Sequence, residues 1–116
     1  MLLAAHPDDE VVGAAGWAWQ HAPPLSVAFL TRGVPLDRRC FAPGFHDPEI
    51  YANTRRREAE AVWRRHRRRP SLFFAPFTDQ GLYLELKAAA SWLKELVAAV
   101  RPGVILAPAY EAGHPD

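Results

Sequence analysis

The sequence predicts an α/β protein in which helices cover both faces of a parallel sheet. Apolar runs with the length of buried strands alternate with runs of helical period, and proline or glycine marks most of the breaks between them. The composition is globular, with 49% hydrophobic and 23% charged residues. A chain of 116 residues has room for one domain with a modest core. The predicted order of elements is β-α-β-α-β-α-β.

The first strand and the first helix meet at a polar turn. Residues 1–5 are apolar and resemble the end of a strand, and the turn HPDD follows them. A helix is predicted at about 10–21, with Asp8 or Asp9 as its cap, and the proline pair at 23–24 stops it. Because this helix has almost no polar face, we expect it to be buried or pressed against a partner.

The second strand and the second helix are separated by a long irregular stretch. A buried strand is predicted at 25–30, followed by a loop at 31–33. Residues 34–48 carry three prolines and a glycine, so we expect no regular structure there. The next helix is predicted at 49–67, with small and aliphatic residues on one side and arginines elsewhere.

The second half of the chain repeats the alternation. A short strand is predicted at 72–75 and a loop at 76–81. Apolar residues then recur at helical spacing over 86–100, and Pro-Gly at 102–103 ends that helix. The fourth strand is predicted at 104–107.

Two polar turns should face each other in this fold. If the strands take the Rossmann order 3-2-1-4, the first and fourth strands are neighbours at the centre of the sheet. Open α/β sheets bind ligands where the carboxyl ends of such strands meet. These two ends carry His6-Pro7-Asp8-Asp9 and His114-Pro115-Asp116. The sequence therefore predicts a functional site between the two turns.

The first turn has the residue types of a zinc site. Imidazole nitrogen and carboxylate oxygen suit zinc, and His6 and Asp9 are spaced so that both can point at one ion. A catalytic zinc needs three protein ligands and an open position for water, so a third ligand must come from elsewhere, most simply the loop after the fourth strand. Asp8 could then take the proton of the zinc-bound water, and His114 could stabilise the oxyanion or protonate the leaving amine. Alternatively, the two aspartates only cap a helix and His6 only satisfies a backbone group.

The motif AHPDDE after an apolar strand, followed by a Gly-Ala-Ala-Gly helix, resembles the LmbE-like or PIG-L deacetylases. The final AGHPD resembles the start of that family's second signature, HPDH. The resemblance implies a Rossmann-like, zinc-dependent hydrolase that removes the acetyl group from an N-acetylglucosamine-type substrate by attack of a zinc-bound water. It implies that His6 and Asp9 bind the metal and that Asp8 is the general base. His114 matches the acid or oxyanion-stabilising residue, and Asp116 matches the carboxylate that tunes it.

Two weaker matches extend the resemblance. Arg55 with Glu58 resembles an R-x-x-E-A motif in which the arginine contacts the sugar. Asp79 with Gly81 resembles an Asp-x-Gly loop in which the aspartate binds sugar hydroxyls. A solvated helix face and an ordinary turn explain the same residues without any function.

The chain departs from the family pattern at its end, where the histidine that would complete HPDH does not follow Asp116. We therefore expect residues 1–116 to form a single domain of this family, truncated after strand four and incomplete at its C-terminus. The third zinc ligand is expected just beyond Asp116. His46 or Cys40 would replace it only if the path of their loop brought them close. A catalytically inactive fragment or remnant of the family is the alternative interpretation.

Charge, cysteine content and hydropathy argue against three other classes of protein: nucleic-acid-binding, disulfide-rich and membrane-spanning proteins. A net charge of +1, from 14 basic and 13 acidic residues, predicts no nucleic-acid partner. The single cysteine excludes an internal disulfide framework. The uncharged stretch 11–31 is broken by polar residues and two prolines, so we predict no membrane span, and no signal peptide is recognisable. We expect a cytoplasmic protein that acts on a small amino sugar; the aglycone and the oligomeric state stay open.

Two partner-binding interpretations compete with the enzyme. His-Pro-Asp is also the signature of J-domain co-chaperones, but there it lies between two helices and follows a basic helix, whereas here it follows strand-like runs. Eight arginines between Arg55 and Arg69 form a basic stretch that can engage phosphates. No aromatic platform is interleaved with them, and a solvated helix face is the commoner explanation.

Overall fold

Three parallel strands alternate with three helices in the structure, a computed structural model that describes residues 1–21 and 24–109. The strands pair in the order β1-β2-β3 and comprise β1 (Leu2–Ala4), β2 (Ser26–Pro35) and β3 (Ser71–Asp79). The helices are α1 (Asp9–His21), α2 (Pro48–Trp63) and α3 (Leu86–Val100), with 3-10 turns η1 (Arg38–Cys40) and η2 (Leu82–Leu84). The predicted Rossmann-like α/β class is confirmed.

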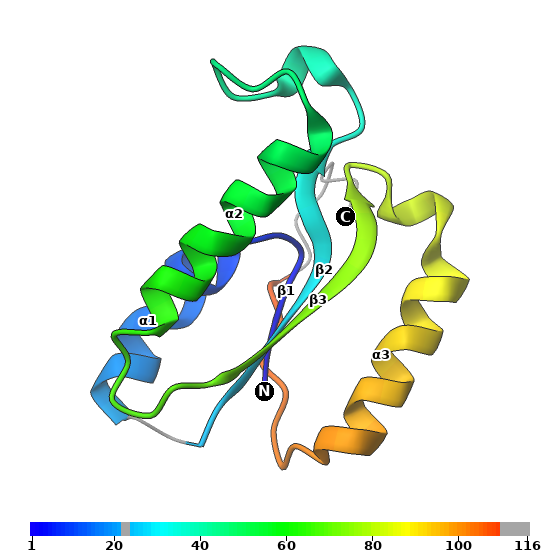
Figure 1. Cartoon of the computed structure of the whole chain (residues 1–116). Coiled ribbons are helices and arrows are strands. Elements are labelled where there is room, and N and C mark those ends of the chain that lie inside the picture. Colours follow the sequence, from blue (N-terminus) through cyan, green and yellow to red (C-terminus); the bar gives the residue numbers. More distant parts are fainter. Residues whose placement is uncertain (22–23, 110–116) are drawn as a thin grey trace.

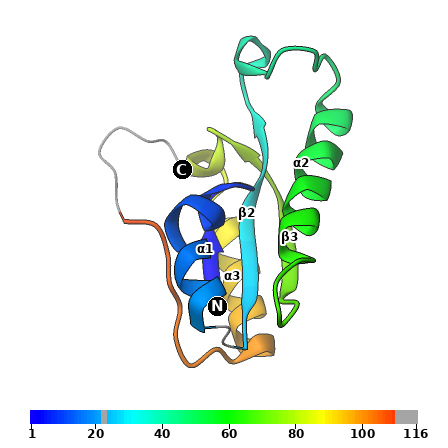
Figure 2. The same ribbon diagram turned by 90° about the vertical axis from the view of Figure 1, so that its left-hand side faces the viewer.

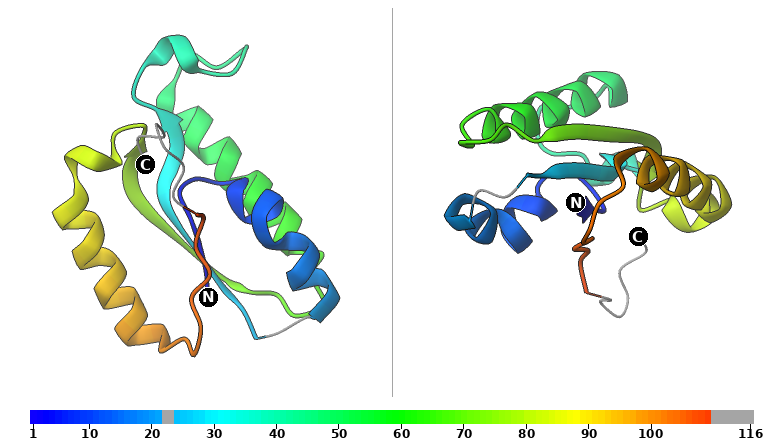
Figure 3. Two further views of the ribbon diagram at one scale, coloured as in Figure 1. Left: turned by 180° about the vertical axis from the view of Figure 1, so that it is seen from behind. Right: turned by 90° about the horizontal axis from the view of Figure 1, so that it is seen from below.

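Helices cover both faces of the sheet (Figure 1), with α1 and α2 on one side and α3 on the other. The view from below separates α1 from α3 in the same way (Figure 3). Successive side chains of a strand point to opposite faces. Phe29 accordingly packs in the core under α1 and α2, whereas Leu30 packs in the core under α3. The first core contains Leu2, Ala4, Ala18, Val27, Phe29, Ala59 and Trp63, and the second contains Ala75, Phe77, Leu82 and Ala89.

The chain after α3 runs beside β1, where the fourth strand was predicted (Figure 3). A single parallel bridge joins Leu2 to Leu106. The Leu3 N–H donates to the Leu106 carbonyl at 2.8 Å, and the Leu106 N–H donates to the Met1 carbonyl at 2.9 Å. This position next to β1 is the one that the order 3-2-1-4 requires. In place of the predicted strand at 104–107, the structure has this single bridge.

Strands β2 and β3 extend farther toward the carboxyl edge than predicted, and Figure 2 shows β2 continuing past the start of α1. The residues predicted as a loop at 31–33 belong to β2, and β3 continues to Asp79. Thr31 pairs with Phe77 and is fully buried, and its N–H donates to the Ala5 carbonyl at 2.7 Å. The loop predictions were wrong because pairing between strands distant in sequence outweighed the local polar signal.

Helix α1 has nearly the predicted bounds and is not buried among the described residues; the other predicted outcome, packing against a partner, is not tested. Only Glu10 and Ala18 are buried, whereas Val12 is 89% exposed and Trp17 is 44% exposed. Because the described sheet contributes no further strand beyond the bridge at Leu106, one side of α1 has nothing to pack against among the described residues.

Helix α2 ends earlier than predicted because a buried histidine fixes a turn behind it. Asp47 caps its start, and the helix ends at Trp63. The ring of His66, 3% exposed, lies 2.9 Å from the Ala18 carbonyl and 2.6 Å from the Arg68 carbonyl. These contacts bind the turn after α2 to the end of α1.

Helix α3 follows the predicted periodicity, with Ala89 buried against the sheet, and it ends at Val100; Arg101 caps it in the left-handed conformation, with φ of 50°. Within residues 1–21 and 24–109, none of the helices has the length and apolar character needed to cross a membrane.

Candidate metal centre

The HPDD turn lies at the carboxyl edge of the sheet, where β1 ends against the longer β2. Strand β2 continues beyond the end of β1, and its Thr31 N–H donates to the Ala5 carbonyl. The HPDD turn therefore begins next to the part of β2 that follows Thr31. This is the edge at which the sequence predicted a site.

Three side chains of this turn converge. His6 Nδ1 lies 2.8 Å from an Asp8 carboxylate oxygen and 3.4 Å from Asp9 Oδ1. One donor atom from each residue fits within 4.8 Å of the others, which makes them a group that could hold a metal ion. No other group of three or more His, Cys, Asp or Glu side chains within the described residues meets this criterion, and Cys40 and His46 do not belong to this one.

Asp9 is the most firmly held of the three. Its Oδ2 accepts from the Ala5 N–H at 2.9 Å and from the His6 N–H at 3.1 Å. These contacts leave Oδ1 directed toward His6. An aspartate side chain was predicted to cap the start of α1. In the structure, the main-chain carbonyl of Asp8 accepts from the Val11 and Val12 amides.

The backbone at Asp8 is strained, and a buried glutamate supports it. Asp8 has φ of 131°, a value that non-glycine residues rarely adopt. Its N–H donates to Glu10 Oε2 at 2.9 Å, and Trp63 Nε1 donates to Glu10 Oε1 at 3.0 Å. Glu10 is only 3% exposed. The sequence reasoning did not single out Glu10; the available signal was that it is the last acidic residue before the apolar stretch of α1.

Arg55 reaches the turn from α2. Its guanidinium donates to Asp8 Oδ2 at 2.8 Å and to the Pro7 carbonyl. Gly33, with φ of +66°, makes room for it, because a Cβ there would lie 2.8 Å from Arg55 Nε and 2.9 Å from Pro7 Cδ. The structure thus brings Arg55 to the predicted site, where its contacts are with the turn.

A pocket of about 430 Å³ opens beside Asp8 and Arg55. Tyr51, Thr54 and Glu58 of α2 also line it. The Asp8 side chain, 61% exposed, therefore has one carboxylate oxygen near His6, the other on Arg55, and access to a space that can hold a small molecule.

The remaining predicted site residues lie elsewhere. Asp79 ends β3 at the same edge of the sheet and is 5% exposed; β2 separates β3 from β1. His114 and Asp116 lie outside the described residues. The convergence of the two polar turns is therefore not tested.

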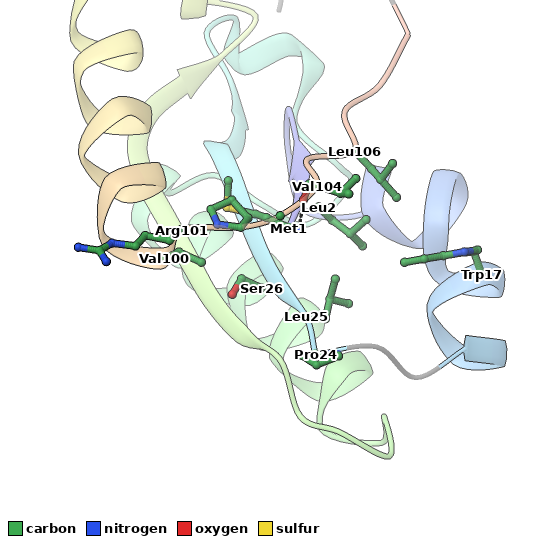
Figure 4. A pocket seen from close by; sticks show the side chains of 12 residues that line it. Met1, Leu2, Trp17, Pro24, Leu25, Ser26, Val100, Arg101, Val104 and Leu106 are labelled. Carbon is green, nitrogen blue, oxygen red and sulfur yellow. Dashed lines mark hydrogen bonds between the residues drawn. The ribbon is translucent and has the colours of Figure 1, made fainter.

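A larger pocket, of about 790 Å³, lies at the other end of the sheet (Figure 4). Trp17 of α1 and Leu25 at the start of β2 line one side, and Val100 and Arg101 at the end of α3 line the other. It contains none of the predicted catalytic, metal-binding or sugar-binding residues.

An ion pair fixes the upper part of β2 against α2. Arg32 donates to both carboxylate oxygens of Glu49, at 2.8 and 2.5 Å. These hydrogen bonds lower the pKa of Glu49 and raise the pKa of Arg32. The strand that carries Gly33 is thereby tied to the helix that carries Arg55.

Comparison with known proteins identifies a family for this chain. The family model PIG-L, described as GlcNAc-PI de-N-acetylase, matches the chain over residues 1–116. No curated protein and no solved structure matches it significantly.

Proposed function

The chain belongs to the PIG-L family, and on this premise we propose that it removes the acetyl group from an N-acetylglucosamine-type substrate with the help of a bound zinc ion. The family is one of deacetylase-type hydrolases. The observation that carries the proposal is the convergence of His6, Asp8 and Asp9 at the carboxyl edge of β1.

The donor atoms of the turn suit zinc. His6 offers a ring nitrogen, and Asp9 offers Oδ1, since its other oxygen already accepts two backbone amides. A carboxylate restricted to one free oxygen fits the small coordination number of zinc better than that of Ca²⁺, which often takes both oxygens. When bound, zinc supplies Lewis acidity toward a water molecule and the substrate carbonyl.

Asp8 is the proposed general base. It borders the pocket, and Arg55 holds one of its oxygens, which fixes the direction of the carboxylate. In the proposed reaction Asp8 accepts a proton from water, the water oxygen bonds to the acetyl carbon, and the C–N bond breaks. The leaving nitrogen takes a proton, for which we propose His114 as donor and Asp116 as the group that tunes it. Asp79 and Arg55 are the proposed contacts to the sugar.

A set of single substitutions separates these roles. In the zinc-loaded chain, Asp8→Asn should lower acetate release from an N-acetylglucosaminide by about 10²–10⁴-fold, the usual contribution of a general base. Zinc affinity, measured by calorimetry, should change little. His6→Ala should instead weaken zinc binding by more than about 100-fold, beyond the usual loss of an outer-shell partner.

Glu95→Gln, an exposed substitution on α3, is the matched control and should change neither property. Full activity of Asp8→Asn would overturn the assignment of the base. If the unmodified chain binds zinc but releases no acetate from any N-acetylated amino sugar, the deacetylase proposal fails and the inactive remnant is the better interpretation.

A further inference from the structure

The loop at the amino edge of the sheet, away from the HPDD turn, carries five exposed arginines. The loop connects the end of α2 to the start of β3 and is crowded with cations. We call it the basic loop; its arginines are Arg64, Arg65, Arg67, Arg68 and Arg69.

These arginines differ from those on α2 itself. Arg55 binds Asp8, and Arg56 pairs with Glu60 and stacks over Phe74 at 4.7 Å. Within residues 1–21 and 24–109, no ion pair involves an arginine of the basic loop. A net charge of +1 for the chain therefore conceals a local excess of positive charge.

The loop is held in place from inside, so its charges face outward. His66, in the middle of the arginine run, is buried and contacts the carbonyls of Ala18 and Arg68. Trp19 packs on Trp63 with ring centroids 4.9 Å apart and lies edge-on to His66 at 5.0 Å. The α2 dipole favours cations only within its last turn. The other arginines of the loop are exposed and unpaired within the described residues, so they are open to an anion from outside.

One tryptophan near the end of α1, Trp19, lies beside these charges through its contacts with Trp63 and His66, whereas Trp17 lines the pocket of about 790 Å³. Trp19 is 38% exposed and Trp17 is 44% exposed. Figure 1 and Figure 3 both show the loop between α2 and β3 next to this end of the helix. Arginines with half-exposed indoles are the combination that favours the headgroup region of a membrane, where the ring is partly buried and the cations meet anionic lipids.

We propose that the basic loop, together with the neighbouring Trp19, docks the protein on an anionic lipid surface. Charge complementarity selects an anionic partner, and the aromatic residue favours lipid over nucleic acid. The basic loop itself contains no Phe, Tyr or Trp, so its arginines are not interleaved with the aromatic platforms on which bases stack.

Docking through the basic loop would place the amino edge of the sheet against the lipid and the carboxyl edge away from it. The basic loop precedes β3 and lies at the amino edge, whereas His6 follows β1 at the carboxyl edge. The candidate metal centre would then face the aqueous side. The docking proposal needs neither zinc nor turnover, so its test is independent of the deacetylase assay.

The test measures partition of the chain onto phosphatidylcholine vesicles with and without phosphatidylserine, by co-sedimentation at low and moderate salt. We expect binding only with phosphatidylserine, and weaker binding as salt screens the charges. Each basic residue near an anionic surface strengthens partition about 5-fold, so Arg67→Gln/Arg68→Gln should weaken it about 25-fold.

The matched control is Arg38→Gln/Arg57→Gln, which removes the same charge from exposed positions outside the loop and should change partition little. Circular dichroism checks that both variants fold. The proposal is overturned if the chain ignores phosphatidylserine, or if both double variants weaken partition equally. Tighter binding to a single-stranded oligonucleotide than to the vesicles, with loss in the same variant, would assign the surface to nucleic acid instead.

Discussion

The charged side chains at the carboxyl edge of the sheet have partners within the fold, whereas those of the basic loop at its amino edge have no ion-pair partner among the described residues. At the carboxyl edge, each charged group of the HPDD turn has a partner: Asp9 accepts from two amides, and Asp8 pairs with His6 and Arg55. The adjacent Glu10 accepts from two donors. In the basic loop, the arginines have no ion-pair partner among the described residues.

The difference indicates that the charges at the carboxyl edge are balanced by groups of the protein itself, whereas those of the basic loop are open to an external partner. A network whose members restrain one another is stabilised by the fold and keeps three donor atoms in place before any ligand arrives. A cluster of like charges contributes nothing favourable to folding, and an external anion would relieve its repulsion. Substitutions at the carboxyl edge should therefore lower stability, whereas substitutions of the basic arginines should leave it unchanged.

The largest effect is expected at Gly33. Replacement by Ala places a Cβ 2.8 Å from Arg55 Nε in a backbone with φ of +66°. Crowding and the left-handed conformation together should lower the free energy of unfolding by about 2–4 kcal/mol, measured by urea denaturation. Gly13→Ala, which meets nothing within 4 Å, should not destabilise, and neither should Arg68→Gln. Equal losses in Arg68→Gln and Gly33→Ala would erase the contrast between the two regions.

The next effect concerns Glu10. Glu10→Ala leaves the Trp63 indole N–H and the Asp8 amide without their acceptor and should cost about 2 kcal/mol of stability. Glu10→Gln, which keeps one acceptor oxygen, should cost less. Thermal unfolding followed by circular dichroism measures both. Two variants as stable as the parent chain would show that the network at the carboxyl edge is dispensable for folding.

The smallest effect is expected for the exposed pair of Arg32 and Glu49. Because Arg32 lowers the pKa of Glu49 in the folded state, the pair stabilises the protein above the ordinary pKa of a glutamate, and this contribution disappears as the pH falls through the lowered pKa. Arg32→Gln should thus reduce the melting temperature slightly at neutral pH and not at all once Glu49 is protonated. A difference that persists at acid pH would point to packing of the arginine stem instead.

The sequence predicted the alternation of elements, the parallel sheet and the place of the HPDD turn, because these follow from periodicity and from strong local signals such as Pro-Gly. It failed where pairing between distant segments decides the structure. The polar residues from Thr31 to Gly33 form a strand only because β3 lies beside them. The support of Asp8 by Glu10 and Trp63 joins residues 53 positions apart in the chain, a contact that no local pattern reveals. Arg55 was identified, but its contact with Asp8 depends on how α2 lies across the sheet.

The crowding around Gly33 also constrains how this protein can evolve. A side chain at position 33 collides with the side chain of Arg55 and with the ring of Pro7, so no one of these three positions can be judged by itself. Loss of the glycine should be tolerated mainly in sequences that already carry a smaller residue at position 55, which makes the two positions epistatic. Relatives of this chain that lack a glycine at position 33 should accordingly also lack an arginine at position 55.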